Sequence, residues 1–448
     1  MRTKVITSSS INAAVMRLDS WLDTMRGPNG YGGPVAHWWQ QSLIYTGAGL
    51  DWRYEGIIEG YLQLWARTGE QEWLRKACRA GDDLLKGQLP SGHYAASSFE
   101  INPASAGTPH EAACDVGLLL LAQVLQQQGD VAWKPYAACA KRNLRLFYVK
   151  QLWDMGLQCV RDDADWPMFV PNKAATACEA FFLLTELTED ALWVERYALP
   201  TLEQVLNHQV RDGSRFDGAI AQNSLGLQRV EKYFPIYIAR CIPALLRAYC
   251  WAEHERYLVC ALKAMRFIVR WMRPDGSLPT VIYPNRQVNR YPNWIAPLGD
   301  VLYAAHTLRA YGFEQDVSPI HQRLLAGQDA SGGIQTARGF AAQASNRLPE
   351  LPDVRDILHV VGWCDKAFRY LTSQIDSNLP LAAHSVGNPS HDSSADMTFE
   401  ADCTFQGQRM HYQETPDIIE ISSKQDVCYR WRKGNPWAEI AREEFWLK

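Results

Sequence analysis

The chain has 448 residues, of which 47% are hydrophobic and 21% are charged, and its formal net charge is −4. This composition is typical of a folded globular protein and excludes wholesale disorder. The sequence contains no block of Lys and Arg, so no basic surface for nucleic acid is predicted. We expect a cytoplasmic protein, because the first residues lack the apolar core of a signal peptide and no apolar run is long enough to span a bilayer.

Motifs for metals and nucleotides are missing from the sequence. His110 and Cys114 stand four residues apart without clustered companions, and there is no His-Glu-x-x-His motif. No Gly-x-x-x-x-Gly-Lys-Ser/Thr loop is present. The eleven cysteines are odd in number and form no Cys-x-x-Cys pair, which predicts reduced thiols that act as small apolar side chains. We therefore expect neither a metal nor a cofactor.

Helical periodicity dominates the chain from residue 9 to about residue 373. The links after the even-numbered helices are only a few residues long, whereas those after the odd-numbered helices run to about twenty residues or more. The pattern predicts twelve helices, at 9–26, 51–68, 70–87, 109–128, 130–152, 172–187, 189–210, 229–252, 254–273, 293–311, 314–326 and 353–373.

The long links resemble one another near their starts, where each has a polar turn with a glycine. These glycines lie at positions 30, 92, 156, 213, 276 and 332, and so step by 62, 64, 57, 63 and 56 residues. Glycine is suited to a helix end because it adopts positive φ at little cost. A period near sixty residues, with one helical hairpin in each unit, indicates an internal repeat.

Six hairpins with long links at one end and short links at the other predict an all-α closed double ring. The even-numbered helices are more apolar and fit the inner ring. Here the sequence resembles the six-hairpin (α/α)6 toroids of many glycoside hydrolases and polysaccharide lyases, and related toroids of terpene cyclases and protein prenyltransferases. The resemblance covers about residues 9–373 and implies a catalytic domain at 1–376 that acts on carbohydrate.

Residues 377–448 form a different kind of segment. Asn378–Asp396 is rich in Ser, Pro, His and Asn and is expected to be a linker. Short alternating stretches then predict a small antiparallel β segment packed on the toroid, followed by a short helix from Asn435. The stretches are Met397–Gln406, Arg409–Glu414, Ile418–Ser423 and Val427–Arg432.

The six inner helices should start at the same mouth of such a toroid, so their first residues are candidates for a site. The first start places Asp51 and Glu55 four residues apart, on one helical face, with Arg53 between them. The helix dipole favours acids at this end, but two such acids also suit proton transfer in a pocket. Candidate substrate-binding rings surround them: His37, Trp38, Trp39 and Trp52.

The second start contains His110, Glu111 and Asp115. Thr108 and Glu111 match a capping box, which is a structural reason for this glutamate. Asp115 stands on an otherwise apolar helix and must find either a partner or a pocket.

The third start contains Asp162 and Asp163, followed by Trp166 and Lys173. Such a loop is either solvated or part of a site. Its placement loosely resembles the unsaturated glucuronyl hydrolases, which use aspartates at such positions. The stretch Asp162-Asp-Ala-Asp165 is one residue shorter than the Asp-Asp-x-x-Asp motif that binds metal diphosphates.

The other starts offer groups for anions and for proton abstraction. Tyr233 suits the removal of a proton beside a uronate carboxylate, while Arg290 and Trp294 suit anion contact and stacking. At the sixth start, Asp353 is the expected N-cap and Arg355 is a candidate substrate contact.

Together these features predict an enzyme that acts on a saccharide or uronide. A hydrolase would draw its two carboxyl groups from Asp51, Glu55, Asp115 and Asp162 or Asp163. A lyase or epimerase would instead use Tyr233, His37 or His110, with Arg53 or Arg290 on the substrate carboxylate. The alternatives are a terpene cyclase-like enzyme with an aromatic cavity and a non-catalytic toroid that binds glycan or protein.

Overall fold

The computed structural model describes residues 8–36, 43, 45–98, 104–285, 287–342, 347–376, 397–424 and 426–443. Within these ranges all twelve predicted helices are present, two of them divided by a break. The starts predicted at 229 and 293 are wrong, because those residues lie in strands and the helices begin at Pro235 and Leu298. The α-helices are α1 (Ser8–Thr24), α2 (Arg53–Thr68), α3 (Gln71–Gly87), α4 (Ala112–Gln127), α5 (Trp133–Asn143), α6 (Pro171–Thr188), α7 (Leu199–Asn207), α8 (Pro235–Arg240), α9 (Ile242–Ala252), α10 (Glu255–Arg270), α11 (Leu298–Leu308), α12 (Ser318–Ala326), α13 (Val354–Ile357) and α14 (Val361–Ser373).

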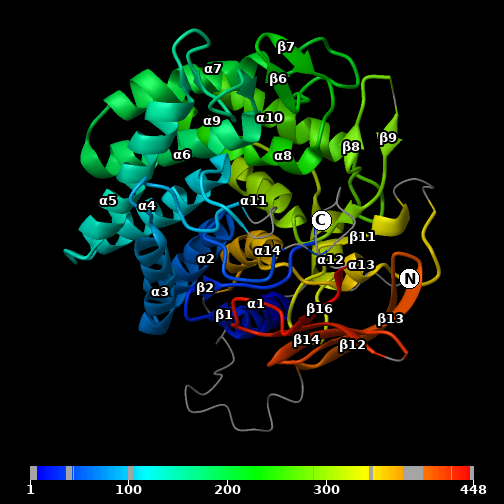
Figure 1. Ribbon diagram of the computed structural model, residues 1–448. Coiled ribbons are helices and arrows are strands. Elements are labelled where there is room, and N and C mark those ends of the chain that lie inside the picture. The colour runs from blue at the N-terminus through cyan, green and yellow to red at the C-terminus, as the bar shows by residue number, and fades with distance from the viewer. Residues whose placement is uncertain are drawn as a thin grey trace.

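Two rings of helices make up most of the molecule (Figure 1). In the inner ring, α2, α4, α6, α8 with α9, α11 and α14 each pack against the next, and α14 returns to α2. The outer ring consists of α1, α3, α5, α7, α10 and α12, each packed on an inner helix. The predicted (α/α)6 toroid is therefore confirmed.

The two rings differ because their helices bury different surfaces. Inner helix α6 buries residues on all sides, from Ala174 to Leu187, as expected for a helix with neighbours all round. Outer helix α3 buries one stripe, including Trp73, Ala77 and Leu84, and leaves its charged face in solvent.

Glycines allow the inner helices α2 and α11 to approach α14 closely. A Cβ on Gly56 would collide with Asp365, and one on Gly60 would collide with Phe368. A Cβ on Gly299 of α11 would likewise collide with the backbone of Lys366. The close approach brings charged side chains of these three helices within reach of one another.

Short antiparallel ribbons decorate the long links. Those formed by β5 with β6 and by β10 with β11 each connect two neighbouring links and so rim one end of the toroid. The strands are β1 (Arg26–Gly27), β2 (Gly30–Tyr31), β3 (Trp153–Asp154), β4 (Cys159–Val160), β5 (Met168–Phe169), β6 (Asn223–Leu225), β7 (Gln228–Val230), β8 (Val281–Ile282), β9 (Val288–Asn289), β10 (Asn293–Trp294) and β11 (Ala337–Arg338).

The C-terminal part forms a five-stranded antiparallel sheet in chain order, which lies next to α1 (Figure 1). Its strands are β12 (Phe399–Phe405), β13 (Gln408–Glu414), β14 (Ile418–Ser422), β15 (Val427–Arg432) and β16 (Ile440–Ala441). Four of them were predicted. The short helix expected from Asn435 is wrong for the described residues, because β16 pairs there with β15 at the edge of the sheet.

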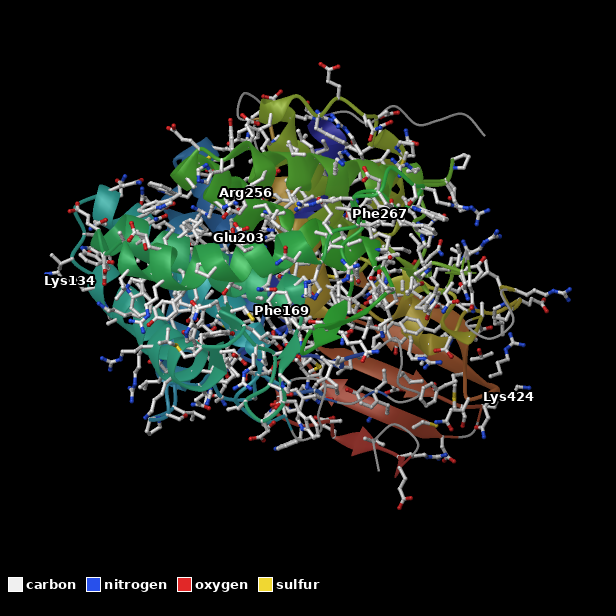
Figure 2. All side chains as sticks on the ribbon, turned by 90° about the horizontal axis from the view of Figure 1, so that it is seen from above. Lys134, Phe169, Glu203, Arg256, Phe267 and Lys424 are labelled. Carbon is white, nitrogen blue, oxygen red and sulfur yellow. The ribbon has the colours of Figure 1, made fainter. Side chains whose placement is uncertain are left out.

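The sheet lies to one side of the toroid (Figure 2). Seen from above, Lys424 of the sheet and Lys134 of α5 lie at opposite ends of the molecule (Figure 2). The predicted linker, 377–396, lies outside the described residues. Within the part of the chain that is described, no helix combines the length and the apolar character needed to cross a membrane.

A buried carboxylate attaches the sheet to the toroid. Glu414 of β13 accepts hydrogen bonds from Trp21 Nε1 of α1 at 2.7 Å and from Lys433 Nζ at 2.8 Å. Its other oxygen lies 2.7 Å from Nδ1 of His359, whose Nε2 lies 2.6 Å from Asp329. Burial opposes the charge on this histidine, but the two carboxylates outweigh burial and raise the pKa of His359 to about 10.

We expect Glu414→Gln to lower the free energy of unfolding by about 3 kcal/mol, because the buried cations His359 and Lys433 lose their counter-charge. Chemical denaturation at neutral pH measures this. As a control, Asp402→Asn removes the exposed partner of Arg409 on the same sheet and should change stability little. Equal effects of the two substitutions would contradict the attachment through Glu414.

Candidate active site

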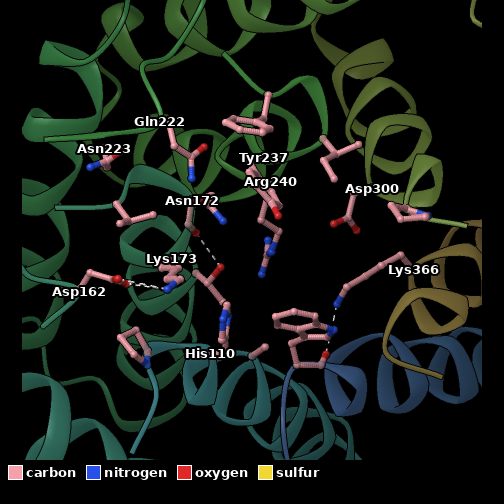
Figure 3. A pocket seen from close by; sticks show the side chains of 18 of the residues that line it. His110, Asp162, Asn172, Lys173, Gln222, Asn223, Tyr237, Arg240, Asp300 and Lys366 are labelled. Atoms are coloured by element: carbon pink, nitrogen blue, oxygen red, sulfur yellow. Dashed lines mark hydrogen bonds and ion pairs between the residues drawn. The ribbon is translucent and has the colours of Figure 1, made fainter. Parts of the chain in front are cut away.

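The six inner-helix starts surround a cavity of about 520 Å³. Every one of them contributes side chains to its wall, together with the links that precede α6 and α8 (Figure 3). The lining residues are Trp52, Glu55, Pro109, His110, Ala113, Asp162, Met168, Val170, Asn172, Lys173, Thr176, Gln222, Asn223, Lys232, Phe234, Ile236, Tyr237, Arg240, Pro297, Asp300, Trp363 and Lys366.

Glu55, which is fully buried, is the centre of the charged floor of this cavity. Its Oε1 accepts hydrogen bonds from Arg240 at 2.7 Å and from Arg369 at 2.6 Å, and its Oε2 lies 3.7 Å from Lys366. Burial alone would raise the pKa of Glu55, but the three cations outweigh burial and lower it to about 2. This carboxylate therefore stays ionised at neutral pH.

The charge network extends from Glu55 to the neighbouring helices. Arg240 also binds Glu179 of α6 at 2.9 Å, and Arg369 binds Asp300 of α11 at 2.7 Å. Oδ2 of Asp300 accepts no hydrogen bond from the described residues. The floor thus presents to the cavity several cationic groups and the Asp300 carboxylate, of which one oxygen is bound to Arg369.

A lysine within this floor has an unusual neighbour. Lys366 Nζ lies 2.9 Å from Asp365, a fully buried carboxyl group. Burial is the largest influence on this group and raises the pKa of Asp365 to about 8, against the attraction of Lys366. The carboxylates of Asp365 and Glu55 in turn raise the pKa of Lys366 against its own burial, so the lysine keeps its charge at neutral pH.

The opposite wall carries a second carboxylate. The two oxygens of Asp162 lie 3.0 and 3.1 Å from Nζ of Lys173. In the close-up, this pair and Asp300 lie on opposite sides of the cavity (Figure 3). Lys232 lines the same rim and has no carboxylate partner among the described residues, although its Nζ lies 5.7 Å from the ring centroid of Phe234.

Aromatic rings form another part of the wall. The ring of Trp52 lies 5.0 Å from that of Trp363 and 4.4 Å from that of His110, measured between centroids. Trp294 is buried behind Trp363, at 5.5 Å. The remaining wall is rich in uncharged hydrogen-bonding groups, from Asn172, Thr176, Gln222, Asn223 and Tyr237.

Five of the residues singled out from the sequence line the cavity: Trp52, Glu55, His110, Asp162 and Lys173. Asp51 and Arg53 do not, because they form a buried pair at 2.8 Å, in which burial raises the pKa of Asp51 although Arg53 opposes it. Asp115 is also fully buried and accepts a hydrogen bond from Tyr94 at 2.7 Å. Burial holds the pKa of Asp115 well above its ordinary value.

Glu111 binds the preceding loop and the end of α5 rather than the cavity. It accepts hydrogen bonds from Ser97 Oγ at 2.7 Å and from Asn143 Nδ2 at 2.6 Å. The predicted capping box with Thr108 is wrong, because the Thr108 side chain makes no capping hydrogen bond. Asp353 does cap its helix, and it binds Arg355 at 2.6 Å, outside the cavity.

The other described residues among these candidates are also absent from the cavity wall. Asp163 accepts hydrogen bonds from the backbone of Asp165 and Trp166 in an exposed turn, and Trp166 is 64% exposed. Tyr233 is buried and donates a hydrogen bond to Glu231 at 2.5 Å, and Arg290 is exposed at the outer surface. His37, Trp38 and Trp39 lie outside the described residues.

Several wall residues on the inner helices were not predicted from the sequence. Arg240, Asp300, Trp363 and Lys366 are the main ones. Arg240 and Lys366 are cations on largely apolar helices, and such residues require a partner or a cavity. Among the described residues, no group of three or more His, Cys, Asp or Glu side chains could hold a metal ion.

No family model and no curated protein matches this chain. Solved structures match its fold: an unsaturated glucuronyl hydrolase specific for heparin has a TM-score of 0.57 and 14% identity, over 82% of this chain and 95% of that one. A D-mannose isomerase has a TM-score of 0.59 and 12% identity, over 83% and 99% of the two chains. The α-1,6-mannanase GH76A from Salegentibacter sp. HEL1_6 has a TM-score of 0.53 and 11% identity, over 81% and 98%. These likenesses confirm the predicted toroid.

The position of Glu55 predicts a pH-dependent contribution to stability. Its pKa in the folded chain, about 2, lies below the ordinary value of 4.5, so the contribution is present above pH 4.5 and is lost as the pH falls through 2. From this shift we expect a contribution of about 3 kcal/mol. Denaturation of the wild type and of Glu55→Gln between pH 2 and 7 measures it. A difference between the two proteins that does not shrink in acid would contradict the assignment.

Proposed function

We propose that the chain is a carbohydrate-active enzyme that binds a saccharide or uronide in the cavity and acts on it by carboxylate acid/base chemistry. The observation that carries the proposal is the pair Asp162 and Asp300, which face the same cavity from opposite walls. A sugar ring bound between them would have one carboxyl group on each side, as glycosidic bond hydrolysis requires.

The rest of the lining supports a saccharide ligand. Sugars combine hydroxyl groups, which need hydrogen-bond partners, with C–H faces that pack on aromatic rings. Asn172, Gln222 and Asn223 offer amide groups, while Trp52 and Trp363 offer rings. A hydrocarbon would desolvate the charged floor and the amide groups without offering them hydrogen bonds, which disfavours the terpene cyclase-like alternative.

The electrostatic environment narrows the choice of catalytic groups. Glu55 has a lowered pKa, so it is a poor proton donor, and Asp51 and Asp115 are buried outside the cavity wall. Asp300 and Asp162 remain. In the proposed hydrolysis one of them protonates the leaving-group oxygen, and the other either activates water or attacks the anomeric carbon.

Lys232 provides a cation at the rim for an acidic sugar. Lys232 lines the cavity without a carboxylate partner among the described residues, so a uronate carboxylate could become its counter-ion. Arg240 and Lys366 add to the positive potential of the floor. The structural neighbour that is an unsaturated glucuronyl hydrolase supports the same substrate class by fold analogy.

Isomerisation or epimerisation is the second candidate. The structurally similar D-mannose isomerase shares the fold. His110 and Tyr237 both line the cavity, where they could transfer a proton to or from a sugar carbon. Tyr233, the tyrosine favoured from the sequence for a lyase or epimerase, lies outside the wall.

We expect Asp162→Asn and Asp300→Asn each to lower kcat by about 100- to 10,000-fold, the usual effect of losing a general acid or base. An unsaturated heparin disaccharide, α-1,6-mannotriose and D-mannose form the substrate panel, and nuclear magnetic resonance of the products reports hydrolysis and isomerisation. Asp163→Asn, which changes the half-buried aspartate beside Asp162 that lies outside the cavity wall, should retain wild-type activity. Full activity in both cavity variants would exclude the proposed pair.

We expect Lys232→Gln to raise KM for the unsaturated heparin disaccharide by about 10- to 100-fold, because a hydrogen bond to a charged group is lost. The KM for the neutral α-1,6-mannotriose should not change if that sugar is turned over. Steady-state kinetics of the two substrates measure the difference. A uniform change for both sugars would mean that Lys232 does not select an acidic group.

A further inference from the structure

A second, smaller hollow of about 190 Å³ lies on the outer side of the rim, between the end of α10 and the β8–β9 and β10 strands. Arg273 and Arg290 line it, together with Trp271, Ser277, Leu278 and Asn293. This arginine hollow combines two guanidinium groups with an aromatic ring and apolar side chains. None of its residues belongs to the wall of the large cavity.

The two arginines of the hollow carry exposed charges. Arg273 and Arg290 are exposed and have no ion-pair partner among the described residues. Arg323 lies behind them, where its Nη2 donates a hydrogen bond to Asn293 Oδ1 at 3.1 Å. Its Nε is buried and has no hydrogen-bond partner among the described residues.

One carboxylate stands near this cluster. It belongs to Asp275, whose Oδ2 lies 3.6 Å from Arg323 and whose Oδ1 accepts hydrogen bonds from the hydroxyl of Ser277 at 2.6 Å and from the backbone of Ser277 at 3.1 Å. Burial lowers the pKa of Arg323, and the nearby cations Arg338 and Arg273 act in the same direction, against Asp275. Positive charge is therefore in excess here, although the whole chain is negative, at −4.

The arginine hollow is connected to the large cavity through the rim. Asn293 lines the hollow, and the next residue, Trp294, packs on Trp363 of the cavity wall. On the other side, Ile282 of β8 bridges Tyr233, which stands between the cavity-lining residues Lys232 and Phe234. A ligand in the hollow would therefore contact the outer side of the segments that form the cavity rim.

We propose that the arginine hollow is an outer binding site for an acidic saccharide, in which Arg273 and Arg290 bind a carboxylate or sulfate group and the apolar side of the hollow, at Leu278 and Pro279, contacts the sugar. The saccharide class rests on the proposed function, whereas the anionic character rests on the arginines alone. Guanidinium groups bind planar and tetrahedral oxyanions through paired hydrogen bonds. The substrate of the enzyme would then be an acidic oligosaccharide or polymer with a binding site outside the cavity.

The test is calorimetric titration with a heparin-derived tetrasaccharide, paired with hydrogen exchange over residues 271–293. We expect Arg273→Ala/Arg290→Ala to weaken binding by about 10- to 100-fold and to abolish protection of this segment, because two charge-assisted contacts are lost. Both side chains are exposed, so the double variant should keep the wild-type melting temperature. Arg145→Ala/Arg266→Ala is the matched control, since it removes the same charge from exposed arginines elsewhere and should bind as the wild type does.

Two further ligands distinguish recognition of an acidic saccharide from binding of a sugar chain alone or of a free anion alone. Cellotetraose, a neutral chain, should give no protection of 271–293, and inorganic sulfate should bind much more weakly than the tetrasaccharide. Equal binding by the two double variants, or sulfate binding as tight as that of the tetrasaccharide, would overturn the proposal. The proposed function is tested independently of this site: full activity of the Asp162→Asn and Asp300→Asn variants would contradict it. The Arg273→Ala/Arg290→Ala variant should still turn over the smallest substrate of the panel.

Discussion

The buried carboxylate of Glu55 is the interaction on which the arrangement of the inner ring depends. It binds Arg240 of α8 and Arg369 of α14, and Lys366 of α14 lies near it. A charge in such a place is stable only with counter-charges and hydrogen bonds, and removal of one partner leaves the others unpaired. Through Glu179 and Asp300 the network includes α6 and α11 as well. The network thereby connects five members of the inner ring, α2, α6, α8, α11 and α14, at the floor of the cavity.

The partners of each acid distinguish the carboxyl groups with a structural role from those that are available for catalysis. Glu55 has its charge fixed by the network, and Asp51 and Asp115 have partners away from the cavity. Asp300 shares one oxygen with the network and presents the other to the cavity side, and Asp162 faces it from a link. A rigid floor with functional groups on surrounding links is a common arrangement for binding and catalysis, since links vary without disturbing the core.

The fold was predictable because its signals are local and repeated. Helical periodicity located all twelve helices, and the sixty-residue recurrence of the glycine turns indicated six hairpins. The site was predictable only in part, since partner choice depends on distant residues. Glu55 binds residues 185 and 314 positions away, whereas Asp51 binds Arg53, two positions away, and both looked alike as acids at a helix start. Trp363 and Lys366 became recognisable only once the ring placed α14 beside α2.

The most direct measurement is a crystal structure of the Asp300→Asn variant soaked with the substrate that the wild type turns over. The proposed function predicts a sugar ring in the cavity of about 520 Å³, with the scissile bond between residue 300 and Asp162 and a sugar face against Trp52 or Trp363. An empty cavity at saturating ligand, or a sugar bound away from both carboxyl positions, would contradict the assignment of this cavity as the active site.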